Sequence, residues 1–125
     1  MRRLFLIAVL ACTCIAAEAK LRLADICTDG MVLQQNTEAV IWGTAAPGSQ
    51  ITASGSWNGT SYRAKADAEG RWTIRLKTPG ASYKPYTVTV KGDGSTVRIN
   101  DVLVGEVWFA SGQSNMEMPM RGFYN

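Results

Sequence analysis

The sequence has 125 residues, with 13 lysines and arginines, 10 aspartates and glutamates, and no histidine. This near balance of charge lacks the basic stripe with which proteins follow nucleic-acid phosphates, so we expect no nucleic-acid partner. The length suits one modest domain and is too short for a complete α/β hydrolase, whose sheet needs several strand and helix units.

Residues 1–19 have the features of a secretory signal peptide. Arg2 and Arg3 precede an apolar run, and Ala17-Glu18-Ala19 offers an Ala-x-Ala cleavage site. The run is far shorter than the roughly 20 residues of a spanning helix, so we expect no stable membrane span. These features predict a secreted or periplasmic protein. The alternative is a lipoprotein acylated at Cys12.

The cysteines give no sign of a disulfide or a metal site. Cleavage after residue 19 would remove Cys12 and Cys14 and leave Cys27 alone. One cysteine cannot form an internal disulfide, and without histidine or a second cysteine it is a poor metal ligand. We therefore expect no metal or other cofactor, and we interpret Cys27 as a small core residue rather than a reactive thiol.

From residue 20 to about 104, short β-prone runs alternate with turn signals, and no stretch keeps a helical period for long. Residues 38–42 and 72–76 are predicted strands. In the second, Trp72, Ile74 and Leu76 share one face, which is the alternation of a half-exposed antiparallel strand. We predict a mainly β fold, with an antiparallel β-sandwich of jelly-roll or immunoglobulin-like type, or a partly closed barrel, over residues 20–103.

Several glycine-containing turns are expected between the strands, among them Asn58-Gly59 and Gly92-Asp93-Gly94. Asn58-Gly59 favours a hairpin with a type I′ turn, because both residues accept positive φ angles. With Thr60 it also forms a glycosylation triplet, but the turn explains the pattern more simply. Gly92-Asp93-Gly94 predicts a second turn.

After Asn100-Asp101 the sequence becomes nearly continuously apolar as far as Ala110. Such a run is typical of a strand buried on both faces, as in a parallel sheet covered by helices. We therefore predict a domain boundary near residues 100–105. Residues 104–125 would begin an α/β domain whose first strand spans about 106–110.

Ser111-Gly112-Gln113-Ser114-Asn115 follows this predicted strand, in the position where open α/β sheets bind ligands. Ser114 is a candidate nucleophile, and Gln113 and Asn115 beside it are candidate substrate-binding residues. Such a serine needs a base to take its proton and N–H donors for the oxyanion. The structural alternative is a capping box from Ser114 to Glu117, although Pro119 would distort the helix that follows.

The run from Gly105 to Pro119 resembles the first block of the sialate O-acetylesterase family, a branch of the SGNH (GDSL-like) hydrolases. Upstream, Asp29 to Gln35 and Ala68 to Trp72 resemble the β-rich N-terminal region of those enzymes. The resemblance implies that Ser114 is the nucleophile and that its backbone N–H is one oxyanion donor. It also implies removal of an acetyl ester from sialic acid or an acetylated polysaccharide through an acetyl-serine intermediate, without metal or cofactor.

The family's other catalytic elements match no residue here. They are a glycine and an asparagine of the oxyanion hole and an aspartate–histidine pair near the C-terminus. We therefore expect an N-terminal fragment that is inactive alone. The competing hypothesis is a non-catalytic carbohydrate-binding β-sandwich, in which Trp57, Tyr62 and Tyr83 would stack on sugar rings, although aromatic residues on strands are more often core.

Overall fold

The computed structural model describes residues 20–112. The predicted signal peptide and the predicted site residues Gln113, Ser114 and Asn115 lie outside the described residues. Within residues 20–112 the regular structure is entirely β, which confirms the predicted mainly β fold. No helix in that range has the length and hydrophobicity of a membrane span.

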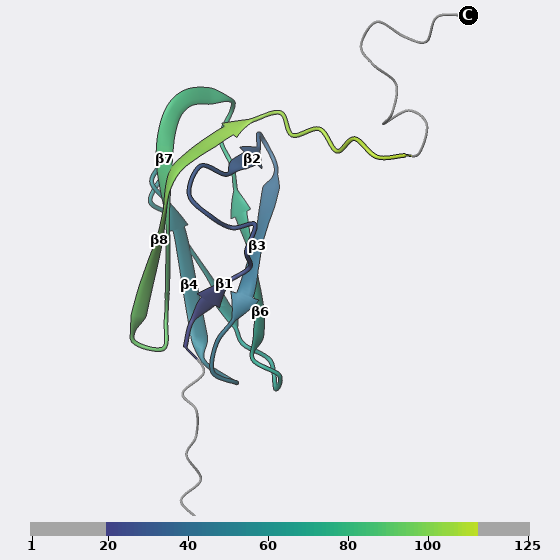
Figure 1. Ribbon diagram of the computed structural model, residues 1–125. Helices are drawn as coiled ribbons and strands as arrows, with labels where there is room; N and C mark the ends of the chain where they lie inside the picture. Colours follow the sequence, from purple (N-terminus) through teal and green to yellow (C-terminus); the bar gives the residue numbers. More distant parts are fainter. Residues whose placement is uncertain (1–19, 113–125) are drawn as a thin grey trace, which may run out of the picture.

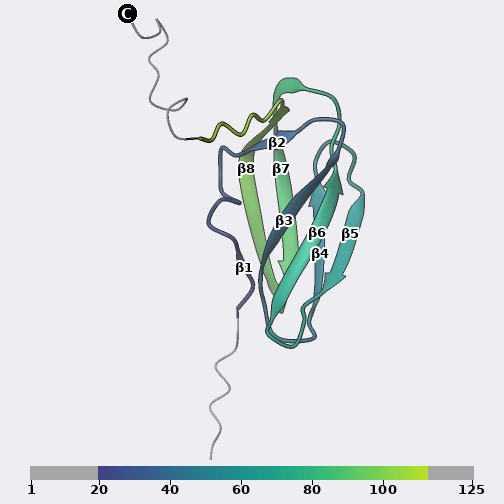
Figure 2. The same ribbon diagram turned by 90° about the vertical axis from the view of Figure 1, so that its right-hand side faces the viewer.

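The described residues 20–112 form eight strands in two sheets, with β1, β3 and β6 in one and β2, β8, β7, β4 and β5, in that order, in the other. Neighbouring strands are antiparallel except β2 and β8, which are parallel. Figure 2 shows β3 and β6 in front of β7 and β8, so the two sheets form separate layers. The strand bounds are β1 Arg22–Leu23, β2 Val32–Gln34, β3 Glu38–Thr44, β4 Gln50–Gly55, β5 Ser61–Lys65, β6 Arg71–Lys77, β7 Ser82–Gly92 and β8 Ser95–Gly105.

The core lies between the inward faces of the two sheets. Strand β6 alternates perfectly, with Trp72, Ile74 and Leu76 buried as predicted and the residues between them exposed. The largest fully buried side chains come from both sheets: Ile41, Leu76, Ile51, Ile99, Val88, Val90 and Val102. Each such aliphatic side chain contributes about 1.5–3 kcal/mol relative to an exposed one, so this shared cluster holds the two layers together.

Strands β4 and β5 form the predicted hairpin, but its turn is not type I′. Such a turn needs positive φ at both central residues. Here Gly59 has φ 65°, whereas Asn58 is not among the positive-φ residues. The Asn58 side chain instead accepts a hydrogen bond from the Thr60 N–H at 3.0 Å, which stabilises a longer loop.

The turn between β7 and β8 does have the backbone of a type I′ turn. Asp93 and Gly94 have φ angles of 50° and 66°, and Gly92 pairs with Ser95 across the hairpin. Positive φ at both central residues matches the right-handed twist of the two strands.

Strand β8 continues through the predicted boundary at residues 100–105. Val88 pairs with Ile99 and Tyr86 with Val102, so β8 has one residue more than β7 between these pairs. This is a β-bulge, and Asp101 takes the left-handed φ of 53° inside it. The change in composition at Asn100-Asp101 therefore marks a bulge within one strand. The division into domains at 103 and 104 stays a prediction.

The predicted strand at 106–110 is not present. Residues 106–112 belong to no strand and lead away from both sheets (Figure 1). Val107, Trp108 and Phe109 are 52%, 87% and 92% exposed. A strand buried on both faces needs neighbours that pair with it and cover it, and the described part of the chain provides none.

Candidate functional site

The segment that leads toward Ser114 leaves the five-stranded sheet at the end of β8. There β2 and β8 run parallel, with Val32 opposite Leu103 and Gln34 opposite Gly105. This register places the side chains of Gln34 and Gln35 beside Glu106, the first residue after β8.

Glu106 is held by two side-chain amides. Gln34 Nε2 donates to Glu106 Oε2 at 2.8 Å, and Gln35 Nε2 donates to Oε1 at 2.5 Å. The Gln34 hydrogen bond, followed by that of Gln35, lowers the pKa of Glu106 below its usual value, although burial opposes the shift slightly. We refer to Gln34, Gln35 and Glu106 as the glutamine clamp.

The glutamine clamp also binds the backbone on either side. The Val107 N–H donates to Gln34 Oε1 at 2.7 Å, and the Gln35 N–H donates to the Gly105 carbonyl at 2.8 Å. Gln35 Oε1 accepts the Ala81 N–H at 2.8 Å. The clamp therefore joins β2, the start of β7 and the exit from β8, and it fixes the direction in which the chain leaves the sheet.

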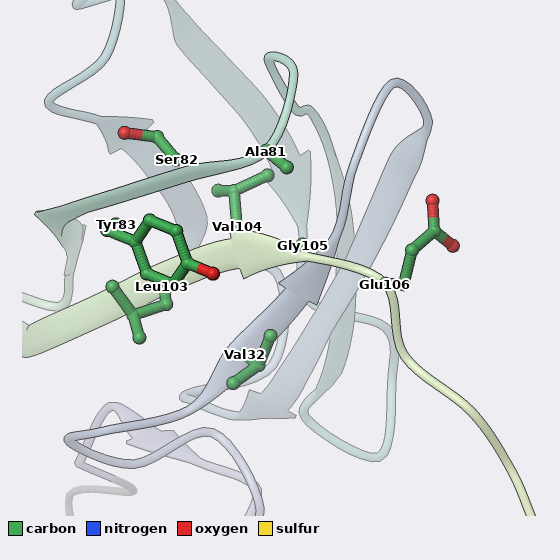
Figure 3. Close-up of a pocket in the computed structure, with 8 residues that line it drawn as sticks. All are labelled: Val32, Ala81, Ser82, Tyr83, Leu103, Val104, Gly105 and Glu106. Carbon is green, nitrogen blue, oxygen red and sulfur yellow. The ribbon is translucent and has the colours of Figure 1, made fainter.

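An apolar groove of about 320 Å³ lies beside the clamp. Figure 3 shows the Tyr83 ring next to Leu103, with Val32 below them and the Glu106 carboxylate pointing away. The lining residues are Val32, Ala81, Ser82, Tyr83, Leu103, Val104, Gly105 and Glu106. The groove's lining is mainly apolar and can bind an apolar group. Its Ser82 hydroxyl accepts the Lys84 N–H, and its Glu106 carboxylate is held by Gln34 and Gln35.

The described residues end directly before the predicted site residues. Ser111 and Gly112 are exposed, and Gly112 has a φ of 137°, which glycine tolerates and other residues do not. Ser114, Gln113 and Asn115 follow directly and are not described. Between residues 20 and 112, no three histidine, cysteine, aspartate or glutamate side chains gather in a way that could hold a metal ion.

Cys27 is 8% exposed and belongs to the core, as predicted.

Two of the three residues proposed to stack on sugar rings, Trp57 and Tyr62, pack against other side chains of the protein. Trp57 Nε1 donates to the Lys77 carbonyl at 3.0 Å, and its ring meets Tyr86 edge to face with centroids 5.6 Å apart. Tyr62 packs against the core, whereas Tyr83 is fully exposed.

Sequence reasoning missed Trp42, which is 40% exposed on the outer face of β3. The signal was present, because alternation along residues 38–44 places Trp42 on the face opposite Ala39 and Ile41.

No family model matches the chain. It is 34% identical over 115 residues to sialate O-acetylesterase from Homo sapiens, a match that covers 83% of this chain and 21% of the human protein. It is 30% identical over 130 residues to the Rattus norvegicus enzyme, covering 98% of this chain and 24% of that one. The crystal structure of a carbohydrate acetylesterase from Xanthomonas citri superimposes with a TM-score of 0.68 at 42% identity, over 78% of this chain and 22% of that structure.

These similarities define a carbohydrate esterase-like region. The chain spans about a fifth of the length of the curated relatives that it matches. More narrowly, it is a sialate O-acetylesterase-like sequence, which confirms the resemblance predicted from the residues.

Proposed function

We propose that this chain belongs to a secreted carbohydrate O-acetylesterase, in which residues 20–105 support the segment that carries the nucleophile Ser114. The similarity to sialate O-acetylesterases across 83% of the chain carries the proposal. The glutamine clamp supports it, since it fixes the chain eight residues before Ser114. A nucleophile gains from such fixing, because catalysis depends on accurate orientation.

The proposed reaction has two steps. A base takes the proton of the Ser114 hydroxyl, and Oγ attacks the acetyl carbonyl of the sugar ester. The Ser114 N–H is one donor to the oxyanion, and Gln113 and Asn115 contact the substrate. Collapse of the intermediate releases the sugar hydroxyl, which regains a proton, and leaves acetyl-serine. The base then takes a proton from water, which attacks the acetyl carbonyl; the bond between this carbon and Oγ breaks, acetate leaves, and Oγ regains a proton.

Histidine is absent from the 125 residues, so this mechanism takes its base from residues outside the sequence. We therefore expect the 125-residue chain alone to be inactive. Its substrate would be an O-acetylated sialic acid or an acetylated polysaccharide, and the mechanism needs no metal.

Acetate release by the full-length protein from O-acetylated sialic acid and from acetylated xylan tests the proposal. Ser114→Ala should lower kcat at least about a thousandfold, because a serine nucleophile and its base act as a unit. Ser111→Ala is the matched control and should keep most of the activity. Full activity in the Ser114 variant would overturn the proposal.

Export is proposed from residues 1–19, with cleavage before Lys20. Sequencing the N-terminus of the exported protein decides between this site and the lipoprotein alternative. A first residue of Lys20 supports the former, whereas an acylated Cys12 at the N-terminus supports the latter.

A further inference from the structure

The outer face of the three-stranded sheet carries an exposed tryptophan with little beside it. Trp42 lies on the middle strand, and its direct neighbours across the sheet are small. Thr73 is paired with it on β6, and on the other side the N–H of Ala24, the residue after β1, donates to the Trp42 carbonyl at 2.9 Å. Small residues at both adjacent positions leave the indole uncovered, whereas larger ones would lie against it. Figure 2 shows β3 and β6 on the side of the molecule that carries this face.

A shallow hollow of about 390 Å³ opens beside the ring. Its lining combines the indole, two threonines, an arginine and the backbone between the strands: Leu23, Ala24, Trp42, Gly43, Thr44, Arg71, Trp72 and Thr73. A wide apolar surface bordered by hydroxyl groups and a guanidinium suits a ligand that has one apolar face and several polar edges. A pyranose ring is such a ligand.

Three arginines lie at the next outward positions around Trp42; Arg71 lines the hollow, and Arg22 and Arg75 lie outside its lining. Arg22 is paired with Thr44, Arg71 is also paired with Thr44 from the other side, and Arg75 is paired with Val40. Each is therefore diagonal to Trp42, within reach for a long side chain. Arg71 forms two ion pairs, from Nε to Asp67 Oδ2 at 3.1 Å and from Nη2 to Glu69 Oε2 at 3.4 Å. Arg22 and Arg75 form no ion pair within residues 20–112.

This face carries a small excess of positive charge. Arg71, Arg75 and Lys77 point outward from β6 and Arg22 points outward from β1, against Glu38 on β3 and the Asp67 and Glu69 carboxylates that pair with Arg71. Guanidinium groups match carboxylates in shape and charge, and they can bind both oxygens at once. The face thus complements an acidic sugar better than a neutral one.

We propose that this face is a binding site for a carboxylate-bearing glycan. The Trp42 indole stacks on the apolar face of one pyranose ring, and Arg75, diagonal to it on β6, binds the carboxylate. The site is separate from Ser114 and goes beyond the proposed esterase function, so either can fail without the other. It would hold the protein on an acidic glycan, whether the acid is a sialic acid or a uronic acid.

Isothermal titration and tryptophan fluorescence with N-acetylneuraminic acid, trigalacturonic acid and neutral lactose test the site. At least one acidic sugar should bind saturably and more tightly than lactose, and added salt should weaken this binding because screening reduces the arginine contribution. If only one of the two acids binds, that acid identifies the source of the carboxylate. Binding of either acid supports the site.

Trp42→Thr and Arg75→Gln should each raise Kd by about tenfold or more, as expected when a central contact is lost. The matched controls are Trp108→Thr, which removes another exposed indole, and Arg63→Gln, which removes an exposed arginine from β5 in the other sheet. Both should bind as the parent does. The proposal is overturned if lactose binds as tightly as the acidic sugars or if neither acid binds saturably. It is also overturned if both test variants bind as the parent does, or if the control variants lose as much affinity as the test variants. Acetate release tests Ser114 independently.

Discussion

Gln34 and Glu106 are joined by a hydrogen bond of 2.8 Å although 72 residues separate them in the sequence. The same Gln34 side chain accepts the Val107 N–H at 2.7 Å. One amide thus binds both the side chain and the backbone of the segment that leaves β8, which makes it the central contact of the glutamine clamp.

Replacing Gln34 with leucine removes the donor to Glu106 and the acceptor for Val107. An exposed hydrogen bond contributes about 0.5–1.5 kcal/mol, so hydrogen exchange at the Val107 amide should accelerate by up to about tenfold. The strand β2 should persist, since its pairing with β8 uses backbone groups. Hydrogen exchange followed by NMR measures the effect.

Gln50→Leu is the control for this variant, because Gln50 is an exposed glutamine on β4 without a side-chain hydrogen bond in the described structure. It should leave Val107 exchange unchanged. Equal acceleration in both variants would show that the clamp does not hold the segment.

The clamp should also depend on pH. The amides of Gln34 and then Gln35 lower the pKa of Glu106 from its usual 4.5. A lowered folded-state pKa means that the stabilisation is fully present above the unfolded-state value and is lost as pH falls through the folded-state value. An NMR titration should therefore give a Glu106 midpoint below 4.5 and changes in the Gln34 amide signals at the same pH. Gln34→Leu should return the midpoint toward 4.5, and a parent midpoint at or above 4.5 would contradict the clamp.

Local alternation predicted much of the fold. The period of two at residues 72–76 placed Trp72, Ile74 and Leu76 in the core, and the isolated Cys27 was expected there. These predictions succeeded because a sheet with one solvated face requires strict alternation. Exposure of Trp42 follows from the same rule, because alternation along residues 38–44 places it on the face opposite Ala39 and Ile41.

Predictions that depended on contacts between residues far apart in the sequence were less accurate. Residues 106–110 have the composition of a buried strand, but a strand forms only where another one pairs with it. The side-chain contacts of Gln34 with Glu106 arise from the parallel register of β2 and β8, which no local pattern shows. Asn58-Gly59 is the dipeptide that a two-residue type I′ turn prefers. The pairing of β4 with β5 nevertheless ends at Ser54 and Ser61, so the connecting loop is longer than two residues.

Gly43 should be essential for the pairing of β1 with β3. A Cβ at this position would overlap the carbonyl oxygen of Arg22, a backbone atom that cannot move without shifting β1. Gly43→Ala should therefore reduce the free energy of unfolding by about 1–3 kcal/mol. Gly105→Ala is the control, because no atom lies within 4 Å of its added Cβ, and it should be neutral or slightly stabilising. Urea unfolding measures both, and equal stability of the two variants would contradict this packing.

Trp57 and Trp72 differ in whether the indole N–H has a partner. Trp57 Nε1 donates to the Lys77 carbonyl at 3.0 Å, whereas Trp72 Nε1 is buried without a partner within residues 20–112. An unsatisfied buried donor costs about 1–3 kcal/mol, so Trp72→Phe removes a cost that offsets its lost packing. Trp72→Phe should destabilise no more than Trp57→Phe, although Trp72 is only 2% exposed. Thermal unfolding of both variants checks this, and a clearly larger loss for Trp72→Phe would contradict it, because lost packing would then outweigh the relief of the unpaired donor.

The apolar segment after β8 should cause self-association of the 125-residue chain. Trp108 and Phe109 are 87% and 92% exposed, and they follow β8 as a continuous apolar stretch with Val107. Contiguous exposed apolar residues favour contact between molecules, because burial removes that surface from water. Replacing both Trp108 and Phe109 with serine should lower the average mass measured by light scattering at high protein concentration. Tyr83→Ser, which removes a fully exposed aromatic residue elsewhere, should have a smaller effect. If both proteins associate like the parent, the contact lies on another surface, and the composition of residues 107–109 needs a different explanation.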